Sequence, residues 1–145
     1  MKINKYIVIA VVAVSLTFVG CEKEEEDNTP PTIENLEIGH DGKFQTGSEL
    51  HVEFDVSDEG GLDYYQISIH PEGDHKSTSE EWEFEQKFTE ISGLKNYSVH
   101  NHEIEVPLDA ELGEYHIDLM VVDLAGNVTS KEIELELVES GVGEE

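Results

Sequence analysis

Large apolar residues recur at every second position from Tyr115 to Val121, the most regular pattern in the chain. A period of two is typical of a β-strand that buries one face and exposes the other. The turn-forming sequence Asp-Leu-Ala-Gly-Asn follows at 123–127. We therefore expect a central strand that ends in a tight turn. Its inward positions are Tyr115, Ile117, Leu119 and Val121, and its outward positions include His116 and Asp118.

Similar, weaker alternation marks the rest of the chain, and no segment after residue 30 shows a helical period. The expected strands are 32–38, 50–56, 62–70, 97–106 and 133–137, with 82–88 as a short strand or flap and 39–48 as a turn-rich loop. Gly113-Glu-Tyr115 resembles the tyrosine corner of immunoglobulin-like domains. About seven strands without helices predict an all-β, immunoglobulin-like antiparallel β-sandwich. Its core should bury Tyr65, Ile67, Ile117, Leu119 and Val121 together.

The first 20 residues have the pattern of a bacterial lipoprotein signal peptide. Lys2 and Lys5 precede an apolar run at 7–19, which is short for a membrane span. The run ends in Phe-Val-Gly-Cys, which resembles a lipobox with Cys21 as the lipidated residue. Because Cys21 is the chain's single cysteine, its acylation would leave no thiol for a disulfide or for catalysis.

An acidic segment follows Cys21 and resembles the surface-export signal of Bacteroidota lipoproteins. We expect an outer-membrane lipoprotein that is exposed at the cell surface or else faces the periplasm, with its lipid as the only membrane contact. The expected divisions are a signal peptide at 1–20, a tether at 21–29, the sandwich domain at 30–139 and a loose tail at 140–145. The formal net charge of −26 argues against a nucleic-acid partner and favours cations.

Histidines supply the first candidate site. His70 ends the third expected strand and His116 begins the central one, both at outward positions. If these strands pair antiparallel, about 4.8 Å apart, the two imidazoles can share one cation. Asp74 and His75 follow in the adjoining loop, and His102 is a further candidate if a bulge turns it outward. Imidazole with carboxylate suits zinc or copper. Exposed histidines at strand edges without metal are the competing interpretation.

Acidic turn residues form a second candidate group, at the end of the sandwich where the 57–61 and 123–127 turns meet. Its members come from three segments of the chain: Asp55, Asp58 and Glu59, then Asp123 and Asn127, with Asp27 and Asn28 before the first strand. Calcium takes six to eight oxygen ligands, which such a group can offer. Asp, Asn and Gly are also what tight turns require. We favour turn chemistry over calcium here, because no Asp-x-Asp-x-Asp run is present.

No catalytic motif is evident: the sequence has no Gly-x-Ser-x-Gly elbow, phosphate loop or dinucleotide fingerprint. We therefore expect a non-enzymatic protein. The leading hypothesis is binding of a divalent transition metal. The alternative is an adhesion or scaffold module for a surface protein, a glycan or an outer-membrane transporter, with Trp82, Phe84 and Phe88 as contact surface.

Several segments together resemble one family, the uncharacterised Bacteroidota lipoprotein family called domain of unknown function 4625. They are Ile67-Ser-Ile-His70 with the loop after it, the aromatic insertion at Trp82, His100-Asn-His102, Ile104-Glu-Val-Pro107 and Gly113-Glu-Tyr-His-Ile117. The resemblance covers roughly residues 30–138. It implies an immunoglobulin-like fold and an envelope setting, and it supplies no established activity.

Overall fold

Eight β-strands make up the fold in the computed structural model, which describes residues 26–72 and 82–141. The strands are β1 (Thr32–Ile38), β2 (Lys43–Gln45), β3 (Glu49–Ser57), β4 (Leu62–Pro71), β5 (Phe84–Phe88), β6 (Asn96–Glu105), β7 (Gly113–Asp123) and β8 (Val128–Val138). No helix long and apolar enough to cross a membrane occurs in these two ranges.

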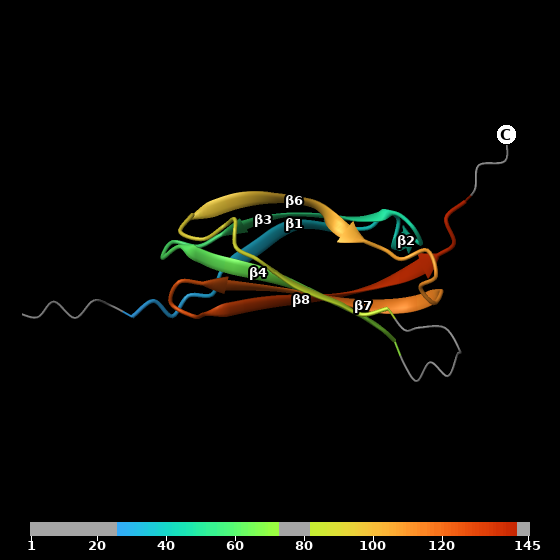
Figure 1. The fold of residues 1–145 in the computed structure, drawn as a ribbon. Helices are drawn as coiled ribbons and strands as arrows, with labels where there is room; N and C mark the ends of the chain where they lie inside the picture. The colour runs from blue at the N-terminus through green and yellow to red at the C-terminus, as the bar shows by residue number, and fades with distance from the viewer. Residues whose placement is uncertain (1–25, 73–81, 142–145) are drawn as a thin grey trace, which may run out of the picture.

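The strands form two facing sheets, which confirms the predicted all-β, immunoglobulin-like sandwich (Figure 1). One sheet has the order β1-β3-β6, and the other has the order β2-β8-β7-β4-β5. Every pairing between named strands is antiparallel except that of β2 with β8. β2 lies within the segment that we expected to be a loop. Its three residues are too short for alternation to show, and only Phe44 is buried.

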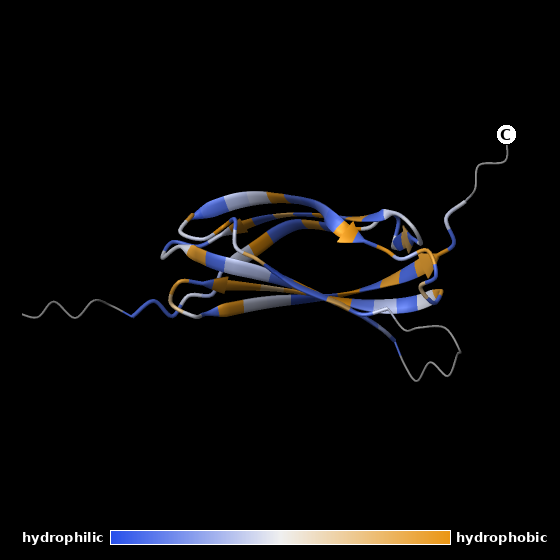
Figure 2. Ribbon diagram, in the orientation of Figure 1, coloured by the Kyte–Doolittle hydropathy of each residue, from blue (hydrophilic) through white to orange (hydrophobic). Residues whose placement is uncertain are grey.

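The core lies between the sheets and is built from the alternate residues of each strand. Hydrophobic and hydrophilic bands follow one another along the strands in Figure 2. All five residues that we expected to be buried together are fully buried. Burial of each such side chain stabilises the fold by about 1.5–3 kcal/mol relative to leaving it exposed. The face of each strand that carries the apolar residues therefore turns inward.

The register between β4 and β7 sets which side chains face one another on these two strands. Ile67 pairs with Leu119, Ile69 with Ile117, and His70 with His116. The buried pairs fix this register, because a slip of one residue would turn apolar side chains to solvent. At the start of β7, the Tyr115 hydroxyl donates to the carbonyl of Glu111 at 2.8 Å, as predicted for a tyrosine corner.

A β-bulge in β6 settles the orientation of its histidines. Leu50 pairs with Ile104 but Val52 pairs with Asn101, so β6 has one residue more than β3 over this stretch. The buried Asn101 side chain accepts a hydrogen bond from the backbone N–H of Glu103 at 2.9 Å, which stabilises the bulge. His100 and His102 are both exposed as a result.

One polar contact links the two sheets through the core. The Asn101 amide donates to the Tyr65 hydroxyl at 3.0 Å, and that hydroxyl donates to a Glu90 carboxylate oxygen at 2.6 Å. The Tyr65 ring stacks on Phe88 and meets Phe54 edge-on. Burial is the main reason why the pKa of Tyr65 lies far above its ordinary value of 10.0. The hydrogen bond from Asn101 acts to lower this pKa, whereas the hydrogen bond to Glu90 and the charge of Glu90 act to raise it.

The aromatic residues around β5 face the core. Phe88 is buried, while Trp82 and Phe84 are partly buried and pack against the core cluster. The Trp82 ring lies 6.1 Å from that of Phe44 and 6.0 Å from that of Tyr115, between centroids. These side chains complete the sandwich, so they do not form the exposed aromatic surface that the adhesion alternative needs.

Replacing Tyr65 by Phe tests the link between the sheets. The variant keeps the aromatic packing but removes the hydrogen-bond partner of the buried Asn101 amide. We expect it to lose about 1–3 kcal/mol of unfolding free energy in urea titrations. The exposed Tyr97→Phe is the matched control and should change it by less than about 0.5 kcal/mol. Equal stability of the two variants would show that the link contributes nothing.

Candidate functional site

The paired histidines lie side by side on the outer face of the β4–β7–β8 sheet, as their parity predicted. The ring centroids of His70 and His116 are 5.3 Å apart, with 22° between the ring planes. The side chain of His70 is 49% exposed and that of His116 only 18%. The structure therefore brings these two imidazoles within reach of a common ligand.

Three carboxylates surround His116. Glu134 of β8 is its direct cross-strand partner, and Glu72 follows the end of β4. Ligand atoms of Glu72, His116 and Glu134 all lie within 4.8 Å of one another. Glu132 is the third carboxylate, with an oxygen 3.4 Å from Nδ1 of His116. The sequence alone did not indicate these glutamates, because their approach depends on the registers of β4 with β7 and of β7 with β8.

The two nitrogens of His116 have different surroundings. Glu132 faces Nδ1 at 3.4 Å, and Glu72 faces Nε2 at 3.8 Å. A proton on Nδ1 satisfies Glu132 and leaves the Nε2 lone pair directed toward Glu72. A carboxylate that holds the second ring nitrogen is the usual support of a metal-bound histidine. In the same way, Nε2 of His70 lies 3.4 Å from Asp118.

The structure does not bring the other residues predicted for this site together with the pair within the part of the chain that it describes. Asp74 and His75 lie outside the described residues, as does Cys21. His102 is not beside His70 and His116, because β6 belongs to the other sheet. The prediction of a common site for His102 with that pair is therefore wrong. The bulge that was one possible way to turn His102 outward is present, but β6 lies in the sheet opposite β4 and β7.

His102 instead meets His51, which the sequence analysis did not select. Nδ1 of His51 lies 3.3 Å from Nε2 of His102, and the ring centroids are 4.7 Å apart. His51 stands between the buried Leu50 and Val52, so its outward parity was readable. What the sequence did not show is the pairing of β3 with β6, which brings the two rings together.

Three residues of the predicted acidic group come together at one end of the sandwich, while Asp55 bonds to Ser98 and Asn35 instead. Carboxylate oxygens of Asp27, Asp58 and Asp123 lie within 4.8 Å of one another. Local hydrogen bonds engage all three: Asp27 accepts from the N–H of Thr29, Asp58 from those of Gly60 and Gly61, and Asp123 from the backbone and amide of Asn127. This arrangement agrees with the turn chemistry that we favoured over calcium.

Asp123 is the most buried member of this group, at 1% exposure. Burial acts to raise its pKa. Hydrogen bonds from the Asn127 amide and from the backbone N–H groups of Asn127, Gly126 and Ala125 outweigh burial and place the pKa below its ordinary value of 3.8. The ionised carboxylate therefore holds the β7–β8 turn.

The fold and the outer-face cluster define an immunoglobulin-like β-sandwich with imidazoles set among carboxylates. The chain belongs to the family described as a domain of unknown function, DUF4625, whose model matches residues 19–138. None of the curated proteins matches the chain.

Asp123→Asn should destabilise the domain, because an amide cannot accept from all the donors that the carboxylate satisfies. We expect a loss of about 1–3 kcal/mol at pH 7 in urea unfolding. Since the folded-state pKa is depressed, the contribution of the carboxylate is present above pH 4 and is lost as pH falls through the folded pKa. The variant should thus lose less stability than the wild type between about pH 5 and pH 2. The exposed Asp109→Asn is the control, and an identical pH profile for both variants would refute this role of Asp123.

Proposed function

We propose that this protein is a cell-envelope lipoprotein whose sandwich domain captures a divalent transition metal ion, zinc or copper(II), on the outer face of β4, β7 and β8. The observation that supports this function best is the convergence of Glu72, His116 and Glu134, with ligand atoms within 4.8 Å of one another and His70 stacked beside them. The proposed role is capture and not catalysis.

His116 is the central ligand in this proposal, through Nε2. A tetrahedral ion with bonds of about 2.0–2.2 Å sets its ligand atoms about 3.3–3.6 Å apart. The exposed side chains of Glu72 and Glu134 need to move by only about 1 Å to reach this separation. His70, which is half exposed, supplies the fourth ligand after rotation of its ring.

The donor set favours zinc or copper(II) over other ions. Imidazole and carboxylate suit both metals, whereas copper(I) prefers thiolate and thioether ligands. Calcium requires six or more oxygens, and a histidine-centred group does not offer them. The formal net charge of −26 attracts all cations, so selectivity has to come from the imidazoles.

The alternative role as an adhesion or scaffold module has lost its main support. That role relied on Trp82, Phe84 and Phe88 as an exposed contact surface, and these side chains pack on the core. The envelope setting of the proposal rests on the lipobox-like sequence ending in Cys21 and on the acidic segment behind it.

Metal binding is tested with the full chain carrying Cys21→Ser, so that no thiol competes for metal. After removal of metal with a chelator, zinc should raise the melting temperature, and zinc at 100 times its dissociation constant should add about 2.7 kcal/mol. The double variant His70→Ala, His116→Ala should lose one bound zinc per chain in equilibrium dialysis. Because protons compete for imidazole nitrogen, this zinc should also be released at about pH 6 and below.

Controls separate the ligands from their neighbours. His40→Ala, at an exposed turn, should bind as much zinc as the parent. Glu132→Gln should weaken binding about 10–100-fold without changing metal-free stability, since Glu132 is proposed to orient His116. His70→Ala alone shows whether His70 is a ligand or only stacks on His116. If the double variant binds as much zinc as His40→Ala, the proposed site is wrong.

Lipidation at Cys21 has its own test. In a bacterial host that processes lipoproteins, the wild type should sediment with membranes and label with radioactive palmitate. Cys21→Ser should not be labelled, because it lacks the thiol that is acylated. It should also not sediment with membranes, because a 13-residue apolar run anchors a protein poorly. Cys21→Ser protein that remains in the membrane fraction after a high-salt wash would contradict the proposed anchor.

A further inference from the structure

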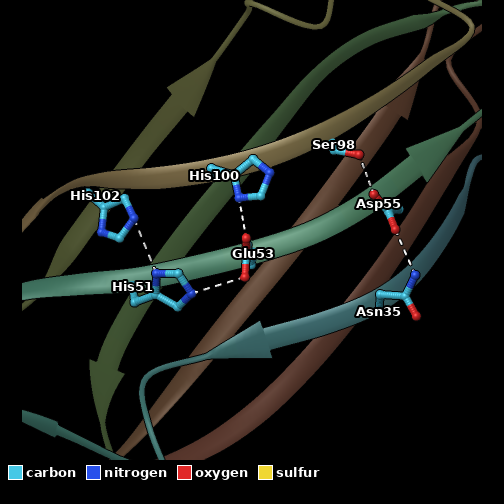
Figure 3. Close-up of polar contacts among 7 residues, drawn as sticks. All are labelled: Asn35, His51, Glu53, Asp55, Ser98, His100 and His102. Atoms are coloured by element: carbon cyan, nitrogen blue, oxygen red, sulfur yellow. Dashed lines mark hydrogen bonds and ion pairs between the residues drawn. The ribbon is translucent and has the colours of Figure 1, made fainter.

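A second histidine cluster lies on the opposite sheet, on the outer face of β3 and β6 (Figure 3). Nδ1 of His51 faces Nε2 of His102 at 3.3 Å. Two nitrogens bound to one tetrahedral ion, with bonds of about 2.0–2.1 Å, are about 3.3–3.4 Å apart. The two rings thus already have the separation of two ligands of one metal ion.

Glu53 holds the rings on this face. One of its oxygens lies 3.3 Å from Nε2 of His51, and the other contacts Nδ1 of His100 (Figure 3). A proton on Nε2 of His51 satisfies the carboxylate and leaves the Nδ1 lone pair directed at His102. Carboxylate, imidazole and metal recur in this order in protein metal sites, where the carboxylate fixes the tautomer and orients the ring.

The neighbouring polar residues mark the limit of the cluster. Asp55, the next outward residue of β3, accepts hydrogen bonds from Ser98 at 2.5 Å and Asn35 at 2.7 Å. The hydrogen bond from Ser98, and next the one from Asn35, lower the pKa of Asp55. Burial opposes this effect, and the charge of His100 adds to the lowering. Asp55 is therefore already hydrogen-bonded to its own donors. The ligands that remain for a metal ion on this face are the ring nitrogens of the histidines.

We propose that His51 and His102 form a second binding site for a divalent transition metal ion, with Glu53 as the positioning residue. Without the ion, Nε2–H of His102 donates to Nδ1 of His51; when the ion binds, His102 carries this proton on Nδ1 instead, so both facing nitrogens offer a lone pair to the ion. Water fills the remaining coordination positions. His51 also borders a cleft of about 600 Å³.

The bulge in β6 is what creates this site. Leu50 pairs with Ile104 and Val52 with Asn101, so His51 stands opposite two residues, His102 and Glu103. Without the extra residue, His102 would share the inward parity of Ile104. The surrounding outer face is acidic, which favours a cation over an anion. Its carboxylates include Glu37, Glu49, Glu53 and Glu105.

The test counts metal ions with zinc alone and, separately, with copper(II) alone, in the full chain carrying Cys21→Ser. We expect two ions per chain in the parent. His51→Ala with His102→Ala should bind one fewer ion, and His70→Ala with His116→Ala should keep the ion at His51 and His102. The quadruple variant should bind none. Ring-nitrogen chemical shifts of His51 and His102 should change on zinc addition even in the His70, His116 variant.

Two further variants separate binding from structure. His100→Ala removes the neighbouring imidazole and should leave the metal count unchanged. Glu53→Gln should weaken metal binding at His51 and His102 about 10–100-fold, with an unchanged melting temperature in the absence of metal. A purely structural Glu53 would lower that temperature and leave the affinity intact, which would overturn its positioning role.

The two metal proposals fail separately. If His51→Ala with His102→Ala keeps the full metal count, the pair is only hydrogen-bonded and this inference is wrong, while the site at His116 is unaffected. If only the His70, His116 variant keeps the full count, the proposed function is wrong and the second site stands.

Discussion

The antiparallel register of β4 and β7 is the constraint on which the rest of the structure depends. Ile67 against Leu119 and Ile69 against Ile117 bury four side chains completely, and a slip of one residue would expose all of them. The same register places the outward residues, so His70 meets His116 as a consequence of core packing. The histidine pair therefore needs no stabilising contact of its own, because the packing of the core brings the two rings side by side.

This dependence explains what the sequence could and could not predict. The face of each long strand was readable from parity, and β4 and β7 were correctly paired because an immunoglobulin-like order makes them neighbours. β2 was missed because three residues with one buried side chain carry no period. Glu72 and Glu134 were missed because strand parity leaves open which of many exposed glutamates lies opposite His116.

His102 illustrates a different limit. Its alternation conflicted with that of Ile104, and one extra residue in β6 resolves the conflict. A bulge is an extra residue in one of two paired strands, so it depends on both. Here the hydrogen bond from the N–H of Glu103 to the Asn101 side chain stabilises it. The sequence of β6 alone can show that its alternation is interrupted. The strand that pairs with β6 determines which side chain faces His102 after the interruption. That strand is β3. Because the pairing of β3 with β6 could not be read from the sequence, His51 was not predicted as a neighbour of His102.

The acidity of the chain acts at two ranges on the proposed metal sites. At long range it draws in cations of every kind, and at physiological salt this attraction is screened beyond about 8 Å. At short range, Glu132 and Glu53 each face one ring nitrogen of a histidine and leave the other nitrogen for a ligand. Salt weakens the first effect far more than the second, because contacting groups leave no room for screening ions. A metal held by the imidazoles should therefore survive a salt concentration that removes cations held only by the diffuse charge, and this difference separates a built site from an acidic surface.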